Sequence, residues 1–259
     1  MTTAKTGERM VPELYRSEAD YILYLRHLFA YETAAARLRP TDAVLDIGCG
    51  AGYGTSMLSR HSQHVTGVDV SADAVLSAHE AYGSEVCRFS TYDGARLPFA
   101  DGCFDAATSF QTIEHVSADE QFLAEAARVL KPGALFVLTT PNRTTRLRDN
   151  QPPWNRFHVR EYSARQLESL LTRHFASVEM RGVRANPRIE AVEHARVAAA
   201  QRLVSLDPLG LRRLAPLVAW FARLRPAPVT GTWPHRVEDF YATPEDRDAG
   251  CDLLAICHR

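Results

Sequence analysis

The sequence predicts a doubly wound α/β fold built on a mostly parallel sheet. Strand-like runs alternate with helical stretches between residues 43 and 139, and such alternation requires the crossover connections of a parallel sheet. The apolar run Val44 to Ile47 leads directly into a glycine-rich turn, Gly48 to Gly54. Because open sheets of this kind bind ligands at the carboxyl ends of their strands, we expect the functional site to follow the strand ends.

The predicted secondary structure begins with a helix from Ser17 to Leu38, for which Ser17 is a suitable N-cap. The alternating region then contains expected strands at 43–47, 64–69, 86–91, 104–109 and 134–139, and expected helices at 52–60, 71–82 and 118–130. Helix 164–174 and strand 177–183 follow. The run 251–257 is expected to be an antiparallel last strand, which makes the sheet seven-stranded and leaves 184–250 as a mainly helical insertion.

The glycine turn is suited to hold a small ligand against bare backbone N–H groups. A side chain at Gly48, Gly50 or Gly52 would keep a ligand away from the backbone, and tight turns between strand and helix often need positive φ. About twenty residues later, Asp69 ends the second strand, where a carboxylate can accept hydrogen bonds from both hydroxyls of a ribose. A glycine-rich turn by itself also fits a plain strand-to-helix loop.

The negative charge of Asp46 distinguishes between two classes of ligand. It would be unfavourable next to a dinucleotide pyrophosphate, but not next to a cationic ligand. Val44 to Gly52 together with Asp69 resemble the motifs of the class I S-adenosylmethionine-dependent methyltransferases. The resemblance continues in the segments that contain Asp93-Gly94 and Glu114-His115. It implies a Rossmann-like methyltransferase fold with S-adenosylmethionine as the cofactor.

The resemblance, which covers residues 40 to 142, also implies roles for individual residues. Asp93, after the third strand, is expected to accept a hydrogen bond from the adenine amino group, although an Asp-Gly pair also simply forms turns. The residues expected to contact the cofactor are Asp46, Gly48, Gly50, Gly52, Asp69, Val70, Asp93, Gly94 and Gln111.

The chain divides into three expected units. Residues 1–40 form an N-terminal arm and helix that cover the active site, as such helices do in the resembling family. Residues 41–183 and 251–259 form the cofactor domain. The insertion 184–250 is expected to act as a lid, a dimer interface or both, since long insertions in compact domains usually carry function. Its apolar stripe consists of Leu203, Leu211, Leu214, Leu217, Val218 and Phe221.

The composition limits the classes of protein to which this chain can belong. With 259 residues, of which 46% are hydrophobic, the chain can bury a sizeable core. Its formal net charge of −1 argues against a nucleic-acid partner, which normally needs a basic domain. The N-terminus lacks an apolar signal region and no run reaches the length of a membrane span, so a cytoplasmic protein with no membrane partner is expected.

Methyl transfer to a hydroxyl requires a base near neutral pH, and histidine is the usual one. His115 and His158 lie on loops after strands, so either is a candidate base, unless backbone carbonyls simply satisfy both rings. The other histidines, His27 among them, are expected at the surface. Glu114 is expected to be a loop or capping residue. The metal is left unknown: Mg²⁺ could bind a vicinal diol, with Glu114, His115 and Asp149 as its only candidate ligands.

The acceptor favoured by the sequence is a sugar hydroxyl, because aromatic faces and planar donors on the loops suit a polyhydroxylated ring. Two alternatives stay open: N-, C- or O-methylation of a lipid, quinone or natural product, and a noncatalytic module that binds S-adenosylmethionine and a partner. A homodimer is also expected. The candidate acceptor contacts are Tyr15, Tyr24, Asn142, Trp154, Arg160, Tyr162 and Trp233.

Overall fold

The structure confirms the doubly wound α/β fold. It is a computed structural model that describes Tyr15, residues 17–205 and residues 233–259. The sheet has eight strands in the order β3-β2-β1-β4-β5-β8-β6-β7. The strands are β1 (Ala43–Ile47), β2 (His64–Asp69), β3 (Cys87–Thr91), β4 (Phe104–Phe110), β5 (Leu130–Pro141), β6 (Ser177–Ala185), β7 (Phe240–Thr243) and β8 (Asp252–His258).

The parallel part of the sheet reverses its order at β1. This strand pairs in parallel with β2 on one side and with β4 on the other, and the parallel pairs β2-β3 and β4-β5 extend the sheet outward. The carboxyl ends of β1 and β4 therefore meet at the switch point, where open sheets bind their ligands. The predicted antiparallel strand near the end of the chain is β8, which lies between β5 and β6.

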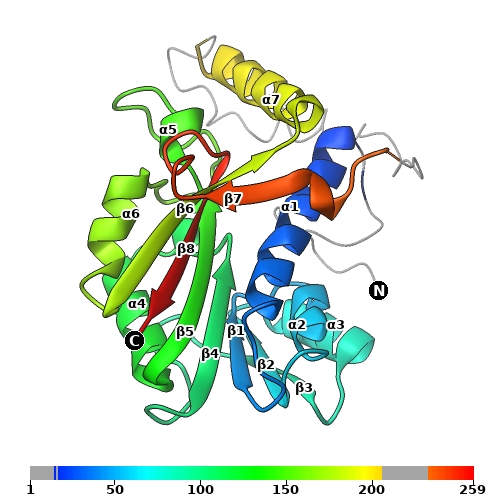
Figure 1. Ribbon diagram of the computed structural model, residues 1–259, viewed down its shortest axis with the longest axis vertical. Coiled ribbons are helices and arrows are strands. Elements are labelled where there is room, and N and C mark those ends of the chain that lie inside the picture. The colour runs from blue at the N-terminus through cyan, green and yellow to red at the C-terminus, as the bar shows by residue number, and fades with distance from the viewer. Residues whose placement is uncertain (1–14, 16, 206–232) are drawn as a thin grey trace.

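Helices cover both faces of the sheet. They are α1 (Glu18–Ala35), α2 (Tyr53–Leu58), α3 (Ala72–Tyr82), α4 (Asp119–Val129), α5 (Arg143–Arg146), α6 (Ala164–Leu171) and α7 (Pro187–Ser205). In Figure 1, α1, α2 and α3 lie on one side of the sheet and α4 and α6 on the other, while α7 crosses the end toward which β4 and β5 point. Tyr31 and Leu58 belong to one core, and Phe122 and Leu167 belong to the other.

The eighth strand, β7, comes from the segment that the sequence predicts to be a helical insertion. It pairs antiparallel with the end of β6, so the predicted count of seven strands is one too low. Four residues are too few to show a reliable alternation in the sequence. Gly182 allows the loop after β7 to approach closely, because a Cβ at this position would lie 1.9 Å from the Asp246 carbonyl oxygen.

The insertion is helical over α7, which packs on the sheet through Ile189. Residues 206–232, with most of the predicted apolar stripe, lie outside the described residues, as do the side chain of Leu203 and the N-terminal arm. The lid and dimer-interface roles therefore stay predictions. No helix in the described ranges combines the length and the apolar character that crossing a membrane requires.

Candidate active site

The glycine turn between β1 and α2 has a backbone conformation that glycine adopts most readily. Gly48, Gly50 and Gly52 have φ values of +82°, +52° and +81°. A Cβ on Gly48 would lie 2.3 Å from the Thr112 hydroxyl oxygen, and one on Gly52 would lie 2.5 Å from the Ala78 Cβ. At Gly50, a Cβ would meet no atom of the described residues within 4 Å. Gly50 therefore presents its backbone to open space, as a ligand cradle requires.

Asp69 links this turn to the end of β2. Its Oδ2 accepts a hydrogen bond from the Gly50 N–H at 3.0 Å, and its Oδ1 accepts one from the Ser71 N–H at 2.9 Å. Each carboxylate oxygen has a second lone pair that can accept from a ribose hydroxyl. The next residue, Val70, is 63% exposed, and a Cβ on Gly94 would lie 3.2 Å from it. The cradle, Asp69 and this apolar contact fit an adenosine group.

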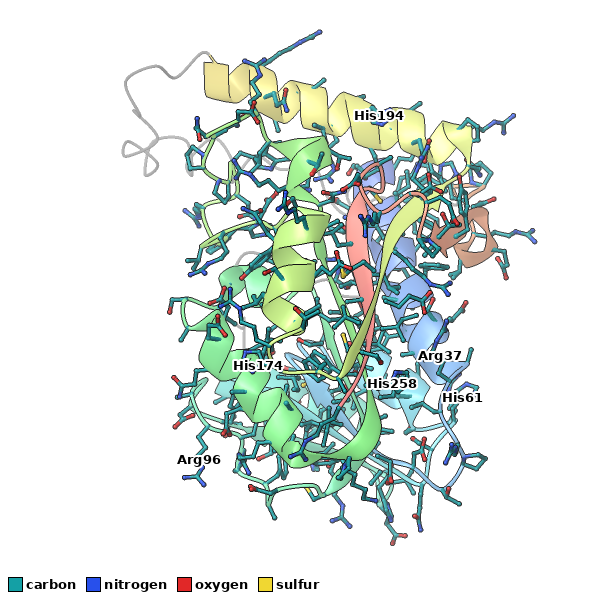
Figure 2. All side chains as sticks on the ribbon, turned by 60° about the vertical axis from the view of Figure 1, so that its left-hand side comes forward. Arg37, His61, Arg96, His174, His194 and His258 are labelled. Atoms are coloured by element: carbon teal, nitrogen blue, oxygen red, sulfur yellow. The ribbon has the colours of Figure 1, made fainter. Side chains whose placement is uncertain are left out.

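Asp93 forms a turn in the loop after β3. Its Oδ1 accepts hydrogen bonds from the Ala95 and Arg96 N–H groups, both at 2.8 Å, and these bonds lower the pKa of Asp93. Figure 2 shows that Arg96 points outward at the edge of the molecule. The turn-forming role is therefore present, and the contact with adenine stays a prediction.

Asp46 is fully buried beneath the glycine turn. Hydroxyl groups of Tyr31, Thr55 and Thr108 donate to its carboxylate at 3.1, 2.7 and 2.8 Å. Burial raises the pKa of Asp46, and the three hydroxyl groups partly offset that rise. Asp46 therefore holds β1, β4, α1 and α2 together under the turn, and its predicted contact with the cofactor stays a prediction.

Gln111, just after β4, has a φ of +50°, and such strained conformations gather at functional sites. Its backbone N–H donates to the Thr139 carbonyl at 2.9 Å, and its Nε2 donates to Asp252 Oδ2 at 3.0 Å. Asp252 also forms an ion pair with Arg26 Nε at 2.9 Å. The Gln111 side chain thus belongs to a buried polar group at the start of β8, which the sequence did not reveal.

The structure brings the two candidate histidines together. The rings of His115 and His158 lie 4.9 Å apart and are nearly perpendicular. Potential ligand atoms of Glu114, His115 and His158 all lie within 4.8 Å of one another. The Val159 N–H donates to the Glu114 carbonyl at 2.7 Å, which fixes the His158 loop against the 3₁₀ turn that contains Glu114 and His115. Acidic and imidazole groups from two loops therefore form one cluster.

His158 is oriented by a buried ion pair behind it. Its Nδ1 lies 2.8 Å from Glu161 Oε1, and Arg146 Nε donates to Glu161 Oε2 at 3.0 Å. Burial alone would raise the pKa of Glu161, but His158 and Arg146 outweigh this effect and lower it. Trp154 lies against this group, with the Arg146 guanidinium 4.6 Å from its ring centroid. Glu161 and Arg146 were not predicted from the sequence as site residues, although Glu161 follows His158 by three residues.

Glu114 is the buried acid of the cluster. Its Oε2 accepts a hydrogen bond from the Thr140 hydroxyl at 2.9 Å, whereas its Oε1 has no hydrogen-bond partner within the described part of the chain. Burial raises the pKa of Glu114 to about 8, although hydrogen bonds, including the one from Thr140, oppose the rise. An unsatisfied buried carboxyl oxygen is costly. Glu114, which the sequence predicted to be a loop or capping residue, is therefore a candidate site residue as well.

Tyr15, Tyr24 and Trp233, three of the predicted acceptor contacts, belong to a chain of aromatic contacts that reaches the glycine turn. The Tyr15 and Tyr24 rings lie 5.3 Å apart, and Trp233 stacks on Tyr21 at 5.5 Å. Tyr24 in turn lies 5.5 Å from Tyr53, the first residue of α2. The structure thus gathers aromatic faces from α1 and the insertion beside the cradle.

Three other predicted acceptor contacts have structural partners. Asn142 is fully buried, caps the start of α5 and donates to backbone carbonyls of the loop before β8. Arg160 and Tyr162 both donate to the Asp119 carboxylate at the start of α4. These side chains therefore anchor loops, and their predicted contact with the acceptor stays a prediction.

A small pocket lies beneath α7, with a cavity volume of about 30 Å³. Its lining includes Arg146, Ile189, Glu193, His194 and Cys251. Figure 2 shows His194 on α7, above the end of the sheet. Because Arg146 lines the pocket and also pairs with Glu161, the pocket adjoins the group that orients His158.

The fold and the cradle define a nucleoside-binding protein of the doubly wound class. Residues 45–138 match the family described as a methyltransferase domain. A probable S-adenosylmethionine-dependent methyltransferase of Mycolicibacterium smegmatis is 33% identical over 258 residues, which cover 98% of this chain and 94% of that protein. One of Mycobacterium tuberculosis is 35% identical over 190 residues, covering 73% and 67%. The chain therefore belongs to the class I S-adenosylmethionine-dependent methyltransferases, which use S-adenosylmethionine as methyl donor.

Solved structures share the fold at low sequence identity. The Bacillus subtilis protein YcgJ matches with a TM-score of 0.56 and 19% identity, covering 90% of this chain and 98% of that one. The [4+2]-cyclase SpnF matches with a TM-score of 0.56 and 22% identity, covering 88% and 79%. These likenesses show the fold alone. Since one of them is a cyclase, the reaction must be argued from the site.

Proposed function

We propose that the protein methylates a hydroxyl oxygen of a small-molecule acceptor at the cluster of Glu114, His115 and His158. The supporting observation is that Glu114 and His115 directly follow β4, whose carboxyl end adjoins the glycine turn, and that His158 joins them from the loop after β5. Thr112, two residues before Glu114, packs so closely on Gly48 that a Cβ there would clash with it. An acceptor held at the cluster would therefore lie next to the cofactor cradle.

The chain's own residues supply positioning and proton removal. S-adenosylmethionine, when bound, supplies an electrophilic methyl group on a positively charged sulfur. Gly50 and Asp69 would hold its adenosine part, and the cluster would align the acceptor oxygen with the methyl group. The hydroxyl proton must also leave, either to an imidazole or because a nearby cation lowers the pKa of the hydroxyl.

The acceptor we favour is a hydroxylated ring or lipid. A relative from Synechocystis, 30% identical over 169 residues, is named as a 2-methyl-6-phytyl-1,4-hydroquinone methyltransferase. One from Mycolicibacterium smegmatis, 32% identical over 142 residues, is named as a fatty-acid O-methyltransferase. These names favour apolar acceptors over the sugar expected from the sequence. Aromatic faces such as Tyr24 and Trp233 suit both kinds of ring, so a sugar belongs in the same test.

The test is transfer of radiolabelled methyl groups to a panel of hydroquinones, fatty acids and saccharides. We expect turnover on one class, and about a hundredfold loss or more in Glu114→Gln and His158→Ala with S-adenosylhomocysteine affinity unchanged. His174→Gln is the matched control, because His174 pairs with exposed Glu120 beyond α6. Figure 2 shows His174 well below the level of His194 on α7. Full turnover in both cluster variants, or transfer only to amines, would contradict the proposal.

A further inference from the structure

We propose that Glu114, His115 and His158 form a binding site for one divalent transition-metal ion. The inference rests on the proposed function and deepens it, because the ion would lie where the acceptor hydroxyl is held. The potential ligand atoms already lie within 4.8 Å of one another. Metal–ligand distances of about 2.0–2.2 Å place two ligands of one ion about 3–4 Å apart. A bound ion would therefore require these atoms to approach one another by about 1 Å.

Both imidazole rings are oriented as metal-binding histidines usually are. The Nδ1 of His115 lies 3.0 Å from the Phe157 carbonyl oxygen, and the Nδ1 of His158 lies 2.8 Å from Glu161 Oε1. A carbonyl oxygen can only accept, so Nδ1 of His115 carries the proton, and the Glu161 carboxylate favours the same tautomer in His158. In both rings Nε2 is then the atom with a ligand lone pair. A carboxylate or carbonyl behind each ring is the usual support of a metal-binding histidine.

Glu114 supplies the independent observation that points to a ligand. Its side chain is fully buried, and Oε1 has no hydrogen-bond partner among the residues that the structure describes. Thr140 satisfies the other oxygen. A cation bound between Oε1 and the two rings would satisfy this atom.

The three candidate ligand atoms indicate which metal ions the site would bind. Two imidazole nitrogens and one carboxylate suit Zn²⁺, Mn²⁺ or Fe²⁺, with further positions left for a substrate oxygen. Mg²⁺, which the sequence left open, prefers oxygen ligands and fits poorly. Positive charge beside the acceptor hydroxyl would lower its pKa. The oxygen–methyl bond then forms as the methyl–sulfur bond breaks, the sulfonium becomes a neutral thioether, and the hydroxyl proton passes to water.

The direct test is titration of the full-length, chelator-treated protein with Co²⁺ and Zn²⁺, monitored by the Co²⁺ absorption spectrum and by calorimetry. We expect one equivalent to bind. Glu114→Gln and His158→Gln should abolish stoichiometric binding, and Glu161→Gln should weaken it about 10–100-fold through loss of the His158 support. His174→Gln should bind like the wild type. Circular dichroism of each variant establishes that it is folded.

The two proposals fail in distinguishable ways. Binding of less than one equivalent by the wild type, or unchanged binding by folded Glu114→Gln and His158→Gln proteins, would overturn the metal site. Full methyl transfer by the chelator-treated protein would overturn the role of the ion and support the proposed function. Stoichiometric metal binding without transfer to any hydroxyl acceptor would support the metal site and overturn the proposed function.

Discussion

At the scale of single residues, Asp69 ties the glycine turn to β2 through the N–H groups of Gly50 and Ser71. We expect Asp69→Ala to weaken S-adenosylhomocysteine binding by about 1–3 kcal/mol, because the turn and the ribose hydroxyls lose their acceptor. Calorimetric titration measures this change. Asp73→Ala, on the exposed first turn of α3, is the control and should bind normally. Unchanged affinity in Asp69→Ala would contradict the assignment of Asp69 to the ribose.

The side chain of His27 makes the stability of the folded protein depend on pH. Although expected at the surface, it is half-buried, and its Nδ1 lies 3.1 Å from the Tyr53 hydroxyl. Burial, and to a smaller extent Arg26, lowers the pKa of His27 to about 3. The unfolded chain takes up a proton near pH 6.5 while the folded protein does not, so this residue reduces stability as the pH falls below about 6.5.

The wild type should lose stability between pH 7 and pH 5. We expect this loss to be about 1–2 kcal/mol smaller in His27→Gln. Glutamine can keep a hydrogen bond with Tyr53 but takes up no proton in this range. Urea unfolding at both pH values measures the difference, with the exposed residue His61 changed to glutamine as the control. The same pH dependence in wild type and His27→Gln would show that His27 is protonated in the folded state.

At the scale of elements, α2 packs against α1 where Gly54 meets Tyr31. A Cβ on Gly54 would lie 1.9 Å from the Tyr31 ring. We expect Gly54→Ala to lower the free energy of unfolding by about 1–3 kcal/mol through overpacking, although alanine favours helix formation. Ser56→Ala on the same helix should change it by less than about 0.5 kcal/mol. Equal urea midpoints for the two variants would show that α1 can move away from the added methyl group without loss of folding free energy.

The predicted elements match the structure best where their signals are local. The strands expected at 43–47 and 64–69 coincide with β1 and β2, and Ser17 caps α1 by accepting a hydrogen bond from the Asp20 N–H. Apolar runs, caps and glycine turns involve residues that are neighbours in the chain. The short edge strand β7 was missed because its four residues are too few to show a reliable alternation.

At the scale of the whole molecule, Arg26 joins α1 to α7 and β8. It pairs with Glu193 at 3.1 Å and with Asp252 at 2.9 Å, and all three side chains are at most 7% exposed. We expect Arg26→Ala to lower the free energy of unfolding by about 3–5 kcal/mol, because two buried carboxylates lose their counter-charge. Urea unfolding measures this. Arg173→Ala, in an exposed pair with Glu120, should cost less than about 1 kcal/mol.

The comparison with Arg173→Ala distinguishes the effect of burying an ion pair from the effect of the ion pair itself. If Arg26→Ala costs no more than Arg173→Ala, water must reach the cluster in the folded protein, and α1, α7 and β8 are not held together by it. A cost that falls when Glu193→Gln is added to Arg26→Ala would support the assignment, since the second change removes one of the uncompensated charges.

The sequence by itself determined the fold class and the cofactor, because strand alternation, the glycines at 48, 50 and 52, and a carboxylate at a strand end are local features. Tertiary structure alone decided the surroundings of the candidate site. Glu114, His158 and Asp252 come from distant parts of the chain and approach one another only in the folded protein, in which β8 lies between β5 and β6. Burial then decides which partners these side chains have, and no spacing in the sequence reports burial.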